Sequence, residues 1–362
     1  DSPNAVYVCS HCGLMQSGCA IGPDNDRVPF PPVGKTVDDK RANGAMALIR
    51  SHCDLTHPLA ALDVGAGRGS FVRKFLNAAP CASITAIEPN AHHAWACAFL
   101  NRSNVIAKPI EEISLPDERF DIIHSLYTLE HLDEPLAALA ELWRTLKSDG
   151  LLILECRNIG VIGDESIVDE WFKPDCRNFY SLNTLSRLMH AAGFEIIDAS
   201  HACERENILF AARKCRAAKR NFLADTLEVH ATRALVSMYK STRQRNLLAL
   251  NAIVAELNTF CERGLAICGS GRLFDSLVQH AGLDRESFRH YSEAQLETES
   301  SRCVGVAGPY GPDRSEAKPG VIVVMSDSHA GEIADIAAQC DPHTQIIHYS
   351  ELVFRAYEGL AA

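Results

Sequence analysis

The sequence lacks several features that would each point to a particular class of protein. It contains no apolar run approaching the about 20 residues that a membrane-spanning helix requires. Its first residues, Asp1 to Asn4, carry no initiator methionine and do not form a signal peptide, so we expect an upstream segment to be missing. The sequence also shows no internal repeat and no low-complexity tract, and its composition does not indicate disorder.

Positive charge is also scarce. The chain has 35 Lys and Arg residues against 46 Asp and Glu residues, which gives a formal net charge of -11. Phosphate binding requires a basic surface, so this balance predicts that no nucleic acid is among the partners. A local basic pocket for one small anion remains compatible with the composition. We expect a small-molecule partner, no membrane contact, and a monomer or homodimer.

The sequence contains enough hydrophobic residues to form folded cores. Hydrophobic residues make up 47% of the 362 residues, a length that predicts two domains with a small appendage. Fourteen cysteines are present, and most lie singly inside apolar runs, where a reduced cysteine behaves as a small hydrophobic residue. A disulfide framework is therefore not expected, and a reducing cytoplasm fits this cysteine usage.

Short apolar runs alternate with helical patterns through the middle of the chain. Strands are expected at 60–64, 83–87, 104–107, 120–125 and 150–156, with helices between them, and two further strands at 194–199 and 207–212. This alternation is typical of a parallel α/β sheet, and the short polar connection between the last two runs predicts a terminal antiparallel hairpin.

The remaining segments suggest four parts. Residues 1–37 form a small N-terminal lobe and linker, 38–215 the α/β core, 216–260 a helical bridge with almost no Gly or Pro, and 261–362 a second, smaller Rossmann-like α/β domain. In that last part, Gly269-Ser270-Gly271 opens a helix and could hold a phosphate or serve only as a turn.

A glycine-rich turn follows the first strand of the core. Leu62-Asp63-Val64-Gly65-Ala66-Gly67-Arg68-Gly69 runs from strand to helix, and its glycines let the backbone approach a ligand closely. The next strand ends at Glu88, followed by Pro89, where a carboxylate can accept hydrogen bonds from both ribose hydroxyls. The same spacing serves NAD and S-adenosylmethionine, and a tight turn without ligand and a solvated glutamate are the plain alternatives.

Five motifs in order resemble the class I S-adenosylmethionine-dependent methyltransferases. They are Asp63 to Gly69, Glu88, Phe120 to Ser125, Leu129-Glu130-His131-Leu132, and Leu146 to Leu152. The resemblance implies a seven-stranded Rossmann-like methyltransferase sheet that ends in an antiparallel hairpin. It also implies cofactor contacts from the following residues: Asp63, Gly65, Ala66, Gly67, Glu88, Pro89, Ile110, Glu111, Ser125 and Leu126.

A wider resemblance covers nearly the whole chain. Cys9-x-x-Cys12 followed by Gly-Leu-x-Gln, then the core, a long helix and a small α/β domain, is similar to the sugar C-methyltransferase family. That family methylates nucleotide-linked sugars and carries an N-terminal zinc lobe, which would make Cys9 and Cys12 metal ligands. A tetrahedral zinc site needs four ligands, and the family's upstream Cys-x-x-Cys pair is absent from this sequence.

The family's proton-removing His-Glu-His run is also absent. Pro174-Asp175-Cys176 stands in its place, so carbon methylation by that mechanism is in doubt and an oxygen or nitrogen acceptor is favoured. The candidates for catalysis are His131, Tyr127, Asp175 and Tyr180. Each of these residues could instead serve packing.

Three functional hypotheses remain open. The first is S-adenosylmethionine-dependent methyl transfer to a sugar, a nucleotide-linked metabolite or another natural-product-type metabolite. The second is an NAD-dependent oxidoreductase, against which the motif from Leu129 to Leu132 and the closing hairpin argue. The third is a non-catalytic protein that retains a cofactor-binding fold. The expected cofactors are S-adenosylmethionine and zinc.

Overall fold

The computed structural model describes most of the chain. The described residues are 5–18, 35–98, 102–162, 167, 171–172, 176–200, 207–215, 224–268, 272–284, 289–291, 319–325 and 342–361. They fall into two compact units, one made of Asp1–Gly163 and Trp171–Ser237, the other of Asp164–Glu170 and Met238–Ala362. The Gly269 to Gly271 turn and Asp175 lie outside the described residues.

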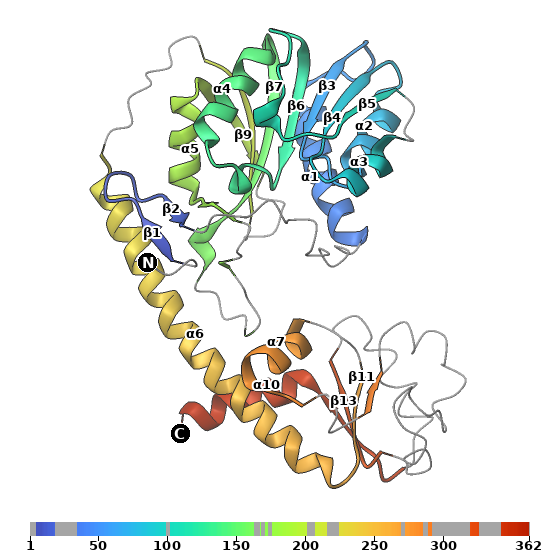
Figure 1. Ribbon diagram of the computed structural model, residues 1–362, viewed down its shortest axis with the longest axis vertical. Coiled ribbons are helices and arrows are strands. Elements are labelled where there is room, and N and C mark those ends of the chain that lie inside the picture. Colours follow the sequence, from blue (N-terminus) through green and yellow to red (C-terminus); the bar gives the residue numbers. More distant parts are fainter. Residues whose placement is uncertain are drawn as a thin grey trace. The chain divides into compact units, whose positions relative to one another are not determined.

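A seven-stranded sheet forms the centre of the first unit, with the strand order β5-β4-β3-β6-β7-β10-β9 (Figure 1). Its strands are β3 (Ala60–Val64), β4 (Ser83–Ile87), β5 (Ser103–Ile106), β6 (Phe120–Leu126), β7 (Leu146–Arg157), β9 (Phe194–Ser200) and β10 (Asn207–Lys214). Strands β3 to β7 pair in parallel, whereas β10 is antiparallel to both β7 and β9. The predicted methyltransferase-type sheet with a terminal hairpin is confirmed, and the antiparallel strand lies one place inside the edge.

Helices cover both faces of this sheet because the strands are apolar on both sides. Helices α1 (Lys35–His52) and α2 (Ser70–Ala78) pack on one face, and α4 (Pro135–Thr145) and α5 (Leu182–Ala191) pack on the other. Helix α3 (Ala91–Ala98) connects β4 to β5, and three short 3₁₀ turns follow as η2 (Ile110–Glu112), η3 (Leu129–His131) and η4 (Ile159–Val161). Ser181 begins α5 with a capping box in which its hydroxyl and that of Thr184 satisfy each other's backbone N–H.

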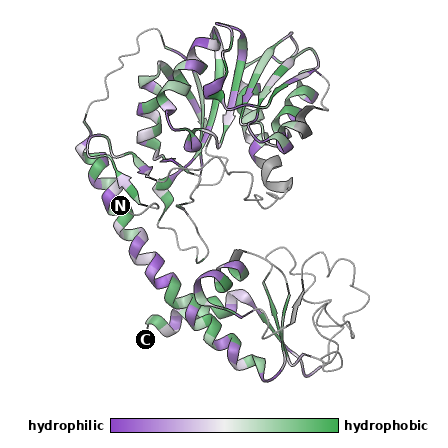
Figure 2. Ribbon diagram, in the orientation of Figure 1, coloured by the Kyte–Doolittle hydropathy of each residue, from purple (hydrophilic) through white to green (hydrophobic). Residues whose placement is uncertain are grey.

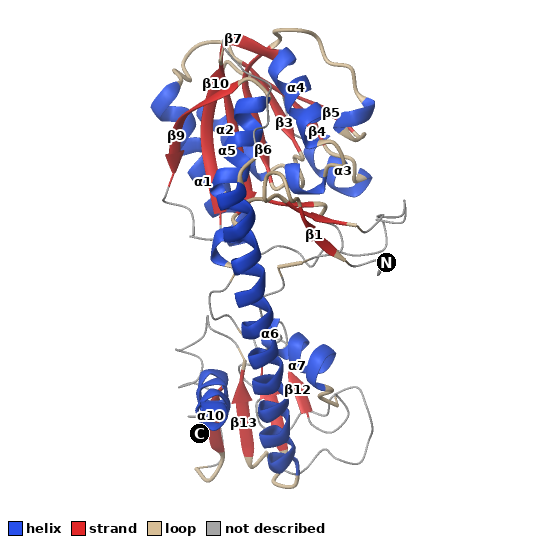
Figure 3. Cartoon of the chain, turned by 90° about the vertical axis from the view of Figure 1, so that its left-hand side faces the viewer, coloured by secondary structure: helices blue, strands red, loops and turns tan. Residues whose placement is uncertain are grey.

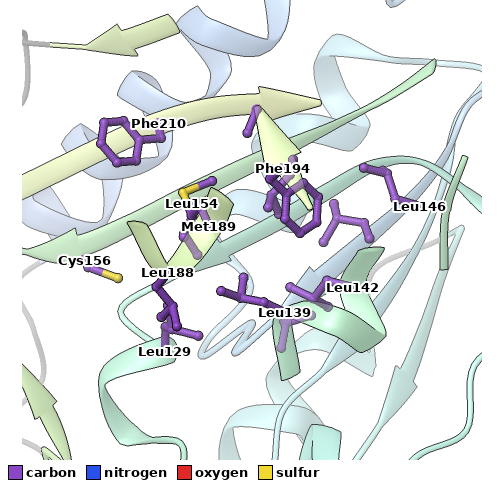
Figure 4. Close-up of a cluster of buried hydrophobic side chains, with 14 of the residues drawn as sticks. Leu129, Leu139, Leu142, Leu146, Leu154, Cys156, Leu188, Met189, Phe194 and Phe210 are labelled. Carbon is purple, nitrogen blue, oxygen red and sulfur yellow. The ribbon is translucent and has the colours of Figure 1, made fainter. Parts of the chain in front are cut away.

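The core on the α4 and α5 face is made of interdigitating aliphatic and aromatic side chains (Figure 4). Phe194 is 1% exposed there and packs with Leu142, Leu146 and Met189. We expect Phe194→Ala to lower the free energy of unfolding by about 3–5 kcal/mol, measured by urea denaturation, because it leaves a cavity in a closely packed core. Leu182→Ala is the matched control, since Leu182 is 56% exposed on α5, and an equal loss there would contradict this packing.

The second unit is a smaller α/β layer structure. Its parallel sheet has the order β12-β11-β13-β14, made of β12 (Arg289–Tyr291), β11 (Leu265–Cys268), β13 (Val321–Val324) and β14 (Gln345–His348). Helices α7 (Arg272–Ala281), α10 (Tyr349–Ala361) and the second half of α6 (Thr226–Cys261) bury their apolar sides against it. The predicted small C-terminal α/β region is therefore confirmed. Figure 3 shows α6 as one uninterrupted helix, and Figure 2 shows polar and apolar residues mixed along it.

A third sheet is small and joins distant parts of the first unit. Strands β1 (Val6–Val8), β2 (Met15–Ser17) and β8 (Asn178–Phe179) pair antiparallel in that order. These strands have two or three residues each, which is too short for an alternating pattern to predict them from sequence. Within the described part of the chain, no helix is both long and apolar enough to span a bilayer.

Candidate cofactor and acceptor site

The glycine-rich turn lies where β3 ends and α2 begins. Gly65, Gly67 and Gly69 have φ angles of 79°, 52° and 76°, a region that favours glycine because it has no Cβ. The N–H groups of Gly65 and Ala66 donate to the carbonyl of Ile87 at 2.9 and 3.0 Å, so the turn is tied to the end of β4. The turn is thereby held beside the residue that follows Ile87.

That residue is Glu88, and its carboxylate faces the turn. One oxygen accepts a hydrogen bond from the N–H of Gly67 at 2.7 Å, and the other accepts from the N–H of Asn90 at 2.9 Å. Glu88 is 7% exposed, whereas a Cβ built on Gly67 meets no atom within 4 Å. An oriented carboxylate beside open space over a glycine fits the ribose and the adjoining chain of S-adenosylmethionine.

The other predicted cofactor residues lie at the same edge of the sheet. Asp63 is buried at the end of β3, and Ser125 and Leu126 end β6, the strand beside it. Ile110 is buried in the turn after β5, with Glu111 exposed beside it, and Pro89 is exposed after β4. The carboxyl ends of parallel strands are where open α/β sheets bind ligands. The structure thus gathers the predicted cofactor residues at one edge, while their contacts with a cofactor stay a prediction.

Thr128 also lies at this edge, although it was not among the residues predicted from the sequence. Its hydroxyl lies within hydrogen-bond distance of the carbonyls of Val64 (3.0 Å) and Leu126 (3.1 Å), and it packs directly against Gly65. A Cβ at Gly65 would overlap the Thr128 hydroxyl. Thr128 therefore ties the end of β6 to the glycine turn, a role that no local sequence pattern indicates.

Tyr127 occupies an unusual position after β6. Its φ of 51° is rare for a residue with a side chain, and its N–H donates to the carbonyl of Glu155 at 2.9 Å. The guanidinium of Arg41, on α1, lies 4.0 Å from the centre of its ring. The phenol hydroxyl is buried without a hydrogen-bond partner, and burial together with the nearby carboxylate of Glu155 raises the pKa of Tyr127.

A second polar group lies around Glu130. One oxygen of this buried carboxylate accepts from the N–H of Arg157 at 2.7 Å, the other has no hydrogen-bond partner, and burial raises the pKa of Glu130. The Arg157 guanidinium lies 4.3 Å from the ring centre of Trp171, and both Glu130 and Arg157 contribute to the electrostatic environment of Tyr127. One polar group therefore contains Arg41, Glu130, Arg157 and Tyr127. Of these residues, only Tyr127 was predicted from the sequence to take part in catalysis.

The two other described catalytic candidates differ in accessibility. His131 is half-buried in η3. Tyr180 is fully buried in the core, with its hydroxyl 3.4 Å from the carbonyl of Leu129, and burial raises its pKa. Their roles in catalysis stay predictions, as does that of Asp175.

Cys9 and Cys12 lie together in the turn between β1 and β2. The N–H of Cys9 donates to the carbonyl of Leu14 at 2.8 Å, and the two thiols are close enough to interact. Burial opposes ionisation of Cys9, but hydrogen bonds from the backbone of His11 and Cys12 lower its pKa. No group of three or more His, Cys, Asp or Glu residues that could hold a metal is present among the described residues. Two thiols alone do not complete a tetrahedral zinc site.

Part of the chain matches the model of a known protein family. Residues 47–199 match the model of a methyltransferase domain. Two curated relatives, from Campylobacter concisus and Ectopseudomonas mendocina, both carry the name tRNA U34 carboxymethyltransferase. They are 31% and 28% identical over 40% and 46% of this chain, and the matches cover 50% and 54% of the relatives. The chain thus spans about half the length of these relatives.

Two of the similar solved structures carry methyltransferase names. An S-adenosylmethionine-dependent methyltransferase from Mesorhizobium loti has a TM-score of 0.41 at 14% identity, covering 47% of this chain and 98% of that one. One from Aquifex aeolicus has a TM-score of 0.40 at 21% identity, covering 49% and 95%.

The relatives named for tRNA contradict one expectation. The partner set predicted from composition, a small molecule without nucleic acid, is wrong by this comparison. Net charge is a sum over the whole chain, and it does not report the local surfaces on which phosphate binding depends. The sheet order, the glycine turn beside Glu88 and the family match agree with one another: residues 47–199 match a methyltransferase domain, and the sheet that they contribute to has the class I methyltransferase fold.

Proposed function

We propose that the protein transfers a methyl group from S-adenosylmethionine to an acceptor bound at the carboxyl edge of the seven-stranded sheet. The observation that carries this proposal is the carboxylate of Glu88, held 2.7 Å from the Gly67 N–H beside open space. The bound cofactor supplies a sulfonium-activated, electrophilic methyl group. The protein has to align an acceptor with that methyl group and exclude water.

Different residues at the carboxyl edge of the sheet bind the cofactor and contact the acceptor in this proposal. Glu88 orients the ribose, and the glycine turn admits the adjoining amino-acid chain. Tyr127, directly after β6, and His131, in η3, lie on the segment that follows the cofactor strands. Tyr127 keeps its proton because burial raises its pKa, so it serves as a hydrogen-bond donor to the acceptor. We propose His131 as the group that receives a proton from the acceptor.

The acceptor we propose is tRNA. Its support is the name shared by the curated relatives, which match this chain over 40% and 46% of its length. The net charge of -11 supplies no general attraction for phosphate, so the proposal requires local contacts near the site.

The test is a transfer assay with S-adenosylmethionine labelled in its methyl group. The acceptors offered in parallel are bulk tRNA and a panel of nucleotide-linked sugars, and Glu88→Ala is the inactive control. Label in tRNA supports the whole proposal. Label in a sugar would keep the transferase and overturn the tRNA acceptor. Cofactor binding with no label in any acceptor would favour a non-catalytic cofactor-binding protein.

Tyr127 and Tyr180 are expected to respond differently to loss of their hydroxyls. Tyr127→Phe should leave the Kd for S-adenosylmethionine within about 2-fold and lower the transfer rate by about 10-fold or more, because one positioned donor is lost. Tyr180→Phe is the matched control. Its hydroxyl makes only a long contact of 3.4 Å inside the core, so the transfer rate should hardly change. Equal effects in the two variants would remove Tyr127 from the acceptor site.

A further inference from the structure

The middle of helix α6 carries charge of only one sign. Between Glu228 and Glu256 the helix contains no Asp or Glu, although the whole chain has 46 acidic residues against 35 Lys and Arg residues. An exposed helix in an acidic protein normally places carboxylates three or four positions from its basic residues. No such carboxylate is available to the basic residues of this segment, which are Arg233, Lys240, Arg243 and Arg245.

These four side chains are largely accessible. Arg233, Lys240 and Arg245 are exposed, and Arg243 is half-buried. The guanidinium of Arg245 lies 5.4 Å from the ring centre of Tyr357 on α10. Among the described residues, no carboxylate forms an ion pair with Arg233, Lys240 or Arg243. Like charges close together on one helix repel each other, and an anionic partner would offset that repulsion.

Helical geometry brings two of the charges into one line of hydrogen-bond donors. Four residues spaced by four, three and four positions lie on one side of the helix, and we call them the donor stripe: Arg233, Ser237, Lys240 and Gln244. All four are exposed, and each side chain can donate a hydrogen bond to a phosphate oxygen. At about 1.5 Å per residue the stripe is roughly 16 Å long, enough to follow several successive phosphates of one strand.

The exposed apolar residues of α6 argue against a membrane as the partner. A helix that lies on a bilayer gathers its apolar side chains on one side and its basic side chains on the other. Leu227 and Met238 are 82% and 47% exposed. They precede Arg245 by 18 and 7 residues, or about five and two turns, so they lie on the same side of α6 as this basic residue. The two kinds of side chain are therefore not separated (Figure 2).

We propose that the donor stripe of α6 binds the phosphate backbone of tRNA and anchors this acceptor to the protein. This inference rests on the proposed function, which takes tRNA as the acceptor. The stripe provides the local basic surface that a chain with a net charge of -11 needs for phosphate binding. Contacts to phosphates position a nucleic acid without reading its bases, so the stripe adds affinity for any tRNA.

The experiment measures the binding of labelled bulk tRNA to the full chain by fluorescence anisotropy at several salt concentrations. The test variant is Arg233→Gln/Lys240→Gln, because glutamine removes the charge and is a good helix former. We expect its Kd for tRNA to rise about 10-fold, and the slope of log K against log salt to fall in magnitude by about 2, one for each lost phosphate contact. Its Kd for S-adenosylmethionine should stay within about 2-fold of the wild type.

Two matched variants separate the donor stripe from charge in general. Arg50→Gln/Arg119→Gln also removes two exposed positive charges, but outside α6, so its Kd for tRNA should stay within about 2-fold of the wild type. Arg233→Lys/Lys240→Arg keeps both charges and should bind tRNA as the wild type does. Equal losses in the test variant and in Arg50→Gln/Arg119→Gln would overturn the inference, and so would an unchanged Kd in the test variant.

The remaining outcomes distinguish this inference from the proposed function. A wild-type protein that binds phosphatidylserine vesicles but not tRNA would overturn the inference and assign the donor stripe to a membrane. Methyl label that enters limiting tRNA equally well with the test variant and the wild type would overturn the role of the stripe and leave the proposed function standing. Absence of label in tRNA with every variant would refute the tRNA acceptor, and the binding assay would still decide whether the stripe holds tRNA.

Discussion

Replacing Glu88 by alanine is expected to weaken S-adenosylmethionine binding by about 100-fold. The carboxylate is already oriented by the N–H groups of Gly67 and Asn90, and it is placed to accept hydrogen bonds from two ribose hydroxyls. Hydrogen bonds to a charged group are worth about 1.5–3 kcal/mol each, so the loss of the pair supports a change of this size. Isothermal titration with S-adenosylmethionine measures it.

Two further variants sharpen this prediction. Glu88→Gln keeps the shape and loses the charge, so its Kd should lie between those of the wild type and Glu88→Ala. Glu111→Ala removes an exposed carboxylate next to a buried isoleucine and should change the Kd far less. Near-wild-type affinity in Glu88→Ala would show that the ligand binds elsewhere.

Gly65→Ala is expected to lower the free energy of unfolding by about 3 kcal/mol or more. Two causes add at this position. The φ of 79° is strained for any residue with a Cβ, and that Cβ would overlap the Thr128 hydroxyl, which is held by two backbone carbonyls. Urea denaturation followed by circular dichroism gives the change.

Gly67 provides the matched control in the same turn. It also has a positive φ, of 52°, but its Cβ would point into open space, so Gly67→Ala should cost only about 1 kcal/mol. Gly67→Val should also remain folded but lose S-adenosylmethionine binding, because the side chain fills the space that the ligand needs. Equal losses of stability in Gly65→Ala and Gly67→Ala would exclude the contact with Thr128 as a cause.

The core of the site could be predicted because each of its residues belongs to a local pattern. Asp63 to Gly69 lies between an apolar strand and a helix, and Glu88 ends the next strand, so the parallel sheet brings them to one edge. The parallel sheet and the terminal hairpin followed from alternation and from one short connection. These features depend on residues that are close together in the sequence, and sequence patterns predict features of this kind most directly.

The remaining features depend on contacts between distant segments. Arg41 reaches Tyr127 only because α1 packs over β7, and Thr128 matters only because it contacts Gly65 in the turn after β3. His124 appeared in the sequence as one polar residue in an apolar strand. Its hydrogen-bond partner, Asp63, lies 61 positions away and is set by strand register. The error about nucleic acid had another cause, since a whole-chain charge was taken as a property of one surface.

The hydrogen bonds that hold Glu88 before any ligand arrives also bear on the speed of binding. The hydrogen bonds from Gly67 and Asn90 hold the Glu88 carboxylate in one rotamer. The conformational entropy of this side chain is therefore already lost on folding and is not lost again when the ligand binds. Association at the ribose end should then proceed in a single kinetic step, without a slow rearrangement after the encounter. Differences in affinity among ligands would accordingly arise in their dissociation rates, and so in how long each one stays bound.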